Sequence, residues 1–129
     1  MKYFKNSEFN DITKLAPVLL TKLDAYRETL AYGVTITSDW SLTGHSKGSE
    51  HYEGYAIDCT SKAPLWWQLA CAEWIGFNNI GVYPAWNGLH LGMRPGDSRR
   101  WIGTGIDANQ QYLDYNMDNL AAVLFKKGA

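Results

Sequence analysis

The fold of this protein is decided by residues 80–93, which read IGVYPAWNGLHLGM. Two short apolar runs flank the turn at 84–88, which contains proline, asparagine and glycine. This arrangement predicts two antiparallel strands joined in a hairpin. Because side chains alternate along a strand, Leu89 and Leu91 should face the core and His90 should face the other way.

Three other stretches have the spacing of helices. Apolar residues recur every three or four positions over residues 12–30, which predicts an amphipathic helix. Residues 64–75 predict a second helix with Ser61 as its cap, and its three tryptophans are expected in the core. A last helical pattern covers residues 113–124, with Asp107 as an upstream cap.

Two further stretches have the alternation of strands. Residues 34–37 are β-branched in every position, and residues 55–59 alternate so that Ala56 and Asp58 face away from the larger hydrophobic side chains. Together with the hairpin and the helices, these strands predict one α+β domain over residues 1–129, in which helices pack on a small, mainly antiparallel sheet.

Composition and charge exclude several classes of protein. Hydrophobic residues make up 46% of the chain and charged residues 19%, which predicts a folded, soluble domain with its own core. A net charge of -1 without a basic stripe argues against nucleic acid or a membrane as the partner. The start of the chain lacks the apolar centre of a secretory signal, so we expect the protein to be made in the cytoplasm and to carry no export signal of its own. We also expect it to be a monomer. Cys59 and Cys71 are expected as buried thiols.

Two of the three histidines lie beside groups that a metal site needs. His51 precedes Gly54 and a strand on which Asp58 points away from the core, and His90 occupies the open face of the hairpin. Aspartate is unfavourable in strands and costly to bury alone, so Asp58 needs a cationic partner. Two imidazoles, one carboxylate and one open position form the pattern of catalytic zinc. An ordinary hydrogen-bonded histidine is the alternative for each of the two.

These residues carry a resemblance to a known family. Residues 49–58 read SEHYEGYAID and match all five fixed positions of Ser-x-His-x-x-Gly-x-Ala-x-Asp. That pattern is typical of the LAS-type zinc D-Ala-D-Ala carboxypeptidases and peptidoglycan endopeptidases, which include phage endolysins. Residues 81–84 and 88–91 resemble the family's Gly-x-Tyr-Pro hairpin with its third ligand, and residues 3–9 and 36–38 resemble its small phage-type members.

The resemblance implies a Hedgehog/DD-peptidase-like fold with His51, Asp58 and His90 as the ligands of Zn²⁺. It also implies hydrolysis of peptide bonds in the stem or cross-bridge of bacterial peptidoglycan, by a carboxypeptidase or an endolysin-like endopeptidase. In such enzymes the zinc activates a water molecule and polarises the scissile carbonyl. A phage or prophage source and action at the bacterial cell wall are the corresponding expectations.

The chain departs from its relatives at the general base. Many relatives carry an acidic residue three positions before the last histidine, and the small phage-type members carry an aspartate two positions after it. Asn87 and Gly92 occupy these places, and neither accepts a proton at neutral pH. Glu50, Glu53 and Asp97 are therefore the candidates for the base, with an ordinary solvated loop carboxylate as the alternative for the glutamates.

A second departure concerns the group that holds a substrate carboxylate. Relatives carry an aromatic residue followed by arginine after the first strand, whereas Trp40 is followed by Ser41 here. Arg94 shares a strand face with His90 and is the nearest substitute, as an electrostatic clamp or as an ordinary surface arginine. Ser49 and Trp86 are the other residues expected at the substrate.

Two functions stay open at this point. The first is a zinc metallopeptidase, and the second is a catalytically degenerate cell-wall-binding or phage structural module that keeps its zinc. His45, in the loop before the motif, is either a group that supports the ligands of the same site, an acid-base group of that site, or an exposed histidine.

Overall fold

A computed structural model of residues 1–129 describes the whole chain except residues 42–43, 46, 106–109 and 126–129. The described residues form an α+β fold with a six-stranded mixed sheet in the order β1-β2-β4-β3-β5-β6. Four pairings are antiparallel, and the β3–β5 pairing is parallel. The predicted class, with a mainly antiparallel sheet, is therefore confirmed.

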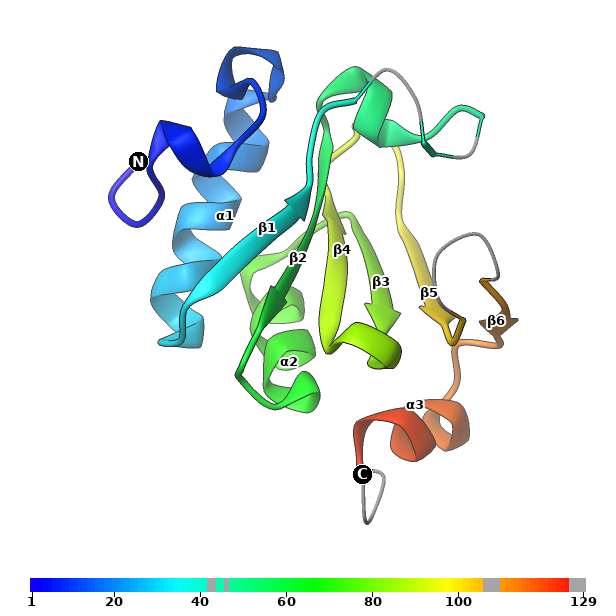
Figure 1. The fold of residues 1–129 in the computed structure, drawn as a ribbon. Helices are drawn as coiled ribbons and strands as arrows, with labels where there is room; N and C mark the ends of the chain where they lie inside the picture. Colours follow the sequence, from blue (N-terminus) through cyan, green and yellow to red (C-terminus); the bar gives the residue numbers. More distant parts are fainter. Residues whose placement is uncertain (42–43, 46, 106–109, 126–129) are drawn as a thin grey trace.

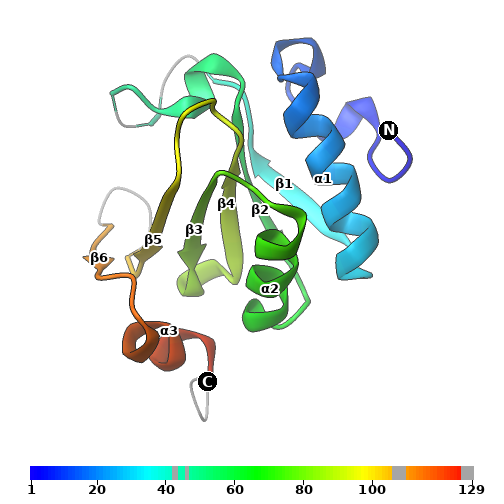
Figure 2. The same cartoon turned by 180° about the vertical axis from the view of Figure 1, so that it is seen from behind.

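The elements lie in two layers. The strands are β1 (Val34–Ser38), β2 (Ala56–Ser61), β3 (Asn79–Tyr83), β4 (Gly88–Gly92), β5 (Arg99–Gly103) and β6 (Tyr112–Leu113). The α-helices are α1 (Pro17–Leu30), α2 (Leu65–Ile75) and α3 (Met117–Leu124), and the 3-10 turns are η1 (Asn6–Glu8), η2 (Ile12–Lys14), η3 (Glu50–Glu53) and η4 (Pro84–Trp86). Figures 1 and 2 show that α1 and α2 cover one face of the sheet, while the other face has no helix over its centre.

The core lies between the sheet and these two helices. Leu19 and Leu23 of α1 are fully buried, as are Leu89 and Leu91 of β4. Between those two leucines, His90 points to the other face, where it contacts polar side chains. The hairpin and the alternation predicted for residues 80–93 are therefore confirmed.

The predicted first helix is divided into two parts. Residues 12–14 form the separate turn η2, and α1 begins at Pro17 rather than at residue 12. Proline disfavours the helical conformation in the residue before it, and Ala16 is accordingly extended, with φ -64° and ψ 135°. The proline thus interrupts a pattern that is periodic in the sequence.

The second helix differs from its prediction at its cap and on its surface. Pro64 is the N-cap, and the Ser61 hydroxyl donates instead to the main-chain carbonyl that precedes β1. Trp67 packs partly against the core, but Trp66 is 45% exposed and Trp74 is 82% exposed. The prediction that all three are core residues was wrong, because α2 is apolar nearly all round and only one side of it meets the sheet.

The C-terminal part differs most from the prediction. The helix predicted over residues 113–124 begins only at Met117, as α3. Its N-cap is Asn116, whose side chain accepts a hydrogen bond from the main-chain nitrogen of Asn119. Asp107, the cap expected from the sequence, lies outside the described residues. Strand β5 was not predicted, because its two arginines hide the alternation.

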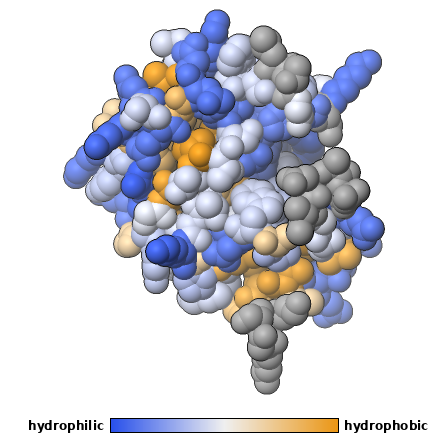
Figure 3. Space-filling model, viewed as in Figure 1, coloured by the Kyte–Doolittle hydropathy of each residue, from blue (hydrophilic) through white to orange (hydrophobic). Residues whose placement is uncertain are grey.

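Hydrophobic surface gathers around α3 (Figure 3).

The two cysteines are free and buried, as predicted. Within the part of the chain that the structure describes, none of the helices has the length and apolar character that a membrane crossing requires.

Candidate metal centre

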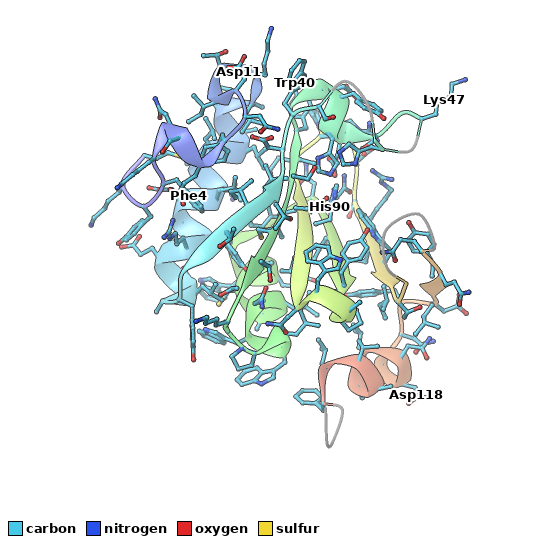
Figure 4. The ribbon with its side chains drawn as sticks, in the orientation of Figure 1. Phe4, Asp11, Trp40, Lys47, His90 and Asp118 are labelled. Atoms are coloured by element: carbon cyan, nitrogen blue, oxygen red, sulfur yellow. The ribbon has the colours of Figure 1, made fainter. Side chains whose placement is uncertain are left out.

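One row of residues across the sheet carries the candidate site. Asp58 on β2 is paired with His90 on β4, His90 with Gly81 on β3, and Gly81 with Trp101 on β5. Residues paired in this way point to the same face of a sheet, and Figure 4 shows His90 on the open face. A Cβ at Gly81 would overlap the indole of Trp101, so this glycine lets the indole lie 4.8 Å from the His90 ring.

His51 reaches the row from the turn η3. The Ser49 hydroxyl accepts a hydrogen bond of 3.3 Å from the main-chain nitrogen of His51 and so caps the turn. Gly54 ends η3 in the left-handed region, with φ 76°, and a Cβ there would overlap the main chain of Lys14. The serine and the glycine of the sequence motif thus position the histidine.

Asp58 is the point at which the two histidines meet. Its Oδ1 atom lies 3.3 Å from Nε2 of His51 and 3.0 Å from Nδ1 of His90. The rings of His51 and His90 are nearly perpendicular, with their centroids 5.0 Å apart. The three residues expected as metal ligands, from η3, β2 and β4, are therefore brought together.

Each imidazole is oriented through its second nitrogen. Nδ1 of His51 lies 3.1 Å from the main-chain oxygen of Asp39. Because a carbonyl oxygen only accepts, this bond places the hydrogen on Nδ1 and directs Nε2 at Asp58. Nε2 of His90 lies 2.5 Å from Oε1 of Glu50. Such outer contacts are how proteins orient histidine ligands of a metal.

Glu50 occupies space that Gly92 leaves free. The glutamate is 1% exposed, and its Oε2 accepts a 3.0 Å hydrogen bond from Nδ2 of Asn79. A Cβ at Gly92 would overlap the carboxylate of Glu50. Burial raises the pKa of Glu50, but the hydrogen bonds from His90 and Asn79 outweigh it and lower the pKa below its ordinary value.

Contacts within this row of residues shift the pKa values of Asp58 and His90 towards their charged forms. Burial of Asp58 opposes its ionisation, yet the contacts with His51 and His90 lower the pKa of this carboxyl well below its usual range. Burial likewise lowers the pKa of His90, but the bonds to Asp58 and Glu50 dominate and raise it. The two carboxylates therefore favour the charged form of His90.

His45 lies beside the site, and its role as a possible metal ligand was not predicted from the sequence. One potential ligand atom from each of His45, His51 and Asp58 lies within 4.8 Å of the other two, so a metal ion could be held among these residues if one of the two imidazole rings turned. The imidazoles of His45 and His51 are stacked, with centroids 3.9 Å apart and planes at 4°. His45 is the chain's third histidine, and its place in the loop before the motif was the only signal in the sequence.

The other candidates for the base and the clamp form an ion network beside the site. Arg94 donates to Glu53 at 2.8 Å and to Asp97 at 2.7 Å, and it also contacts the main-chain oxygen of Gly48 at 2.7 Å. The two carboxylates raise the pKa of Arg94. The arginine thus connects the end of the hairpin to η3 and its preceding loop.

An open pocket of about 640 Å³ lies over the row. Its lining includes Ser49, as expected, together with Glu50 and three cationic residues, which are Lys47, Arg99 and Arg100. Arg100 is paired with Glu73, and Arg99, whose side chain is 51% exposed, lies 3.3 Å from Asp97. Arg94, Glu53 and Asp97 are not among the described residues that line this pocket.

Aromatic side chains form another part of the wall. Tyr83, Trp101 and Tyr112 line the pocket, and the indole nitrogen of Trp101 donates a 2.8 Å hydrogen bond to the Tyr83 hydroxyl. Burial raises the pKa of Tyr83 to about 12, so the phenol keeps its proton. Trp86 does not itself line the pocket and stacks on Tyr83, with centroids 4.9 Å apart.

Comparison with known proteins adds no assignment. A scan against protein-family models and a search of curated proteins both returned no match for this chain.

Proposed function

We propose that this protein is a zinc-dependent peptidase that hydrolyses peptide bonds of bacterial peptidoglycan, as a carboxypeptidase or an endolysin-like endopeptidase. The observation that carries the proposal is the meeting of His51, Asp58 and His90 on the floor of an open pocket. The resemblance of the sequence to peptidoglycan peptidases suggests the substrate, and the proximity of the two histidines to Asp58 supports the binding of a metal ion.

The distance from Asp58 to each of the two histidines suits zinc. Two ligands of a tetrahedral zinc, each about 2.0–2.1 Å from the ion, lie roughly 3.3 Å apart. Oδ1 of Asp58 is 3.3 Å from the nitrogen of His51 and 3.0 Å from the nitrogen of His90. Neutral imidazole and ionised carboxylate are both good zinc ligands, and the lowered pKa of Asp58 keeps its carboxyl ionised.

In this proposal the ion would activate a water molecule and polarise the scissile carbonyl. The residues of the chain do the remaining work. Asp39 and Glu50 orient the two imidazoles, and Tyr83 presents a protonated hydroxyl at the pocket wall. Arg99 is a half-exposed cation at the pocket, and we assign to it, rather than to Arg94, the attraction of a substrate carboxylate.

We assign the general base to Glu50. Small phage-type relatives carry an aspartate at the place of Gly92, and here the Glu50 carboxylate fills the space of the missing side chain. Glu50 also lines the pocket and has a lowered pKa, so it is ionised and able to accept a proton. A carboxylate supplied by η3 thus takes the place of one supplied by β4.

The test compares zinc-loaded wild type with Glu50→Gln on purified wall peptides, with release of new amines as the readout. Glutamine still accepts a hydrogen bond from His90 but cannot take up a proton. We expect chelator-sensitive cleavage by the wild type and a loss of at least about 100-fold in the variant, with zinc retained. The matched control is Glu28→Gln, which makes the same chemical change at an exposed position of α1.

One observation favours the second candidate, a zinc-containing wall-binding or phage structural module. Both oxygens of Glu50 are already engaged, with His90 and with Asn79. A protein that binds zinc and sediments with cell walls but never releases an amine would establish the module and contradict the peptidase. Full activity in Glu50→Gln would leave the peptidase in place and remove Glu50 as its base.

A further inference from the structure

We propose that His45 is a fourth, removable protein ligand of the same metal, which closes the coordination position that hydrolysis needs open. The inference rests on the metal site of the proposed function and not on its peptidase activity. Zinc with three protein ligands keeps a position for water or substrate, whereas zinc with four is a closed, structural site. The side chain of His45 would therefore decide between these two states.

The first support is the distance between His45 and the other ligands. Its ligand atom lies within 4.8 Å of those of His51 and Asp58, and its ring is parallel to that of His51 at 3.9 Å. A metal lies close to the plane of an imidazole that binds it, and one ion cannot lie in two parallel planes that far apart. Ligation by His45 therefore requires one of the two rings to turn, so the stacked arrangement is the open state.

The second support is the way in which the backbone of His45 is held. The Tyr52 hydroxyl accepts a 2.9 Å hydrogen bond from the main-chain nitrogen of His45 and donates a 2.6 Å bond to its main-chain oxygen. Tyr52 belongs to η3, the turn that carries His51. The main chain at position 45 thus keeps a constant place relative to the site, and a change of side-chain rotamer is sufficient to change the ligand set.

The third support is an alternative partner for the same ring. Nε2 of His45 lies 3.1 Å from the Ser38 hydroxyl. Ser38 is paired with Asp58 across β1 and β2, so this hydroxyl lies at the edge of the same row. In the open state the ring is held by Ser38, and in the closed state it binds the ion. Two partners of this kind make a two-state element whose balance a substrate can shift.

The test uses the metal alone. We titrate Co²⁺ into metal-free wild type, His45→Ala, Ser38→Ala and the control Glu28→Gln, and then measure zinc affinity by competition with a chelator. We expect His45→Ala to lower zinc affinity at least about tenfold and to change the visible spectrum of the bound Co²⁺, because a water molecule takes the place of one imidazole. Ser38→Ala should raise zinc affinity, because the ring loses its alternative partner.

The results separate this inference from the proposed function. An unchanged cobalt spectrum and a zinc affinity within twofold of wild type in His45→Ala would overturn the fourth ligand, whatever the peptidase activity. A spectral change in His45→Ala without any cleavage by the wild type would leave the fourth ligand in place and contradict only the peptidase. Circular dichroism of each variant confirms that the domain is folded, and Ser38→Ala repeats the test without removing a histidine.

Discussion

The two faces of β4 differ in what they contact. Leu89 and Leu91 point into the core beneath the helices and are fully buried, whereas His90 and Gly92 point to the open face. On that face His90 is held between two carboxylates, and Gly92 gives room to one of them, that of Glu50. Neighbouring residues of one strand therefore serve stability and chemistry separately.

This difference shows how a small domain can hold several charged groups on a stable sheet. The covered face supplies the apolar burial that stabilises the fold. The open face then carries its polar groups in mutual contact, so that each buried charge has a partner. Substitutions on the covered face should accordingly change the stability of the protein, whereas substitutions on the open face should change its affinity for metal.

The largest effect is expected on the covered face. Leu91→Ala removes a fully buried side chain and should lower the free energy of unfolding by about 2–5 kcal/mol, measured by denaturant titration. The folded variant should still take up zinc as the wild type does. A loss of stability below about 1 kcal/mol would show that the covered face is not the source of stability.

The next effect belongs to the open face. Gly92→Ala places a Cβ in the space of the Glu50 carboxylate and should move that group away from His90. Because the outer partners of a ligand matter to metal affinity, we expect zinc binding to weaken about 10- to 100-fold. Gly33→Ala is the matched control, since its Cβ would meet open space. Equal zinc affinities in the two variants would contradict the role of Gly92.

A smaller effect is expected from pH on the metal-free protein. The pKa of His90 is raised, so the stability that its proton contributes is complete below about 6.5 and is lost as the pH rises through the raised value. The carboxyls of Asp58 and Glu50 have lowered pKa values, so their contribution is present above about pH 4 and is lost in acid.

The melting temperature in the presence of a chelator, measured from pH 3 to pH 9, checks both the alkaline and the acid loss of stability. Zinc affinity should rise over the same alkaline range in which the metal-free protein loses stability, because the ion needs neutral His90. A His90→Gln variant should lack the alkaline loss. A wild-type melting temperature that is constant above neutral pH would contradict the proton on His90.

The smallest effect is expected outside the pocket. The side chain of Glu53 is 52% exposed and is paired with Arg94. Glu53→Gln should change the free energy of unfolding by less than about 1 kcal/mol and leave zinc affinity unaltered. A large loss of cleavage in this variant, with zinc retained, would move the general base from Glu50 to Glu53.

The site was more predictable from the sequence than the helix boundaries were. Alternation placed Asp58 and His90 on one face, since a strand has a fixed period of two. The contact of Glu50 with His90 depends on the space at Gly92, and nothing local to either residue indicates it. The proximity of His45 depends in the same way on a hydrogen bond to Tyr52.

The weaker predictions failed for physical reasons of their own. The helix expected over 12–30 was interrupted by Pro17, and β5 was hidden by the two arginines at its start, which obscure the alternation. Trp74 is apolar but exposed, because periodicity cannot tell which side of an apolar helix meets the sheet.

The most direct measurement is the zinc content of purified, dialysed protein, determined by elemental analysis for wild type and for His51→Ala, Asp58→Asn and His90→Gln. We predict one zinc per wild-type chain and loss of that zinc in each folded variant. Wild-type protein without metal, or variants that all keep their zinc, would contradict a centre built from these three residues.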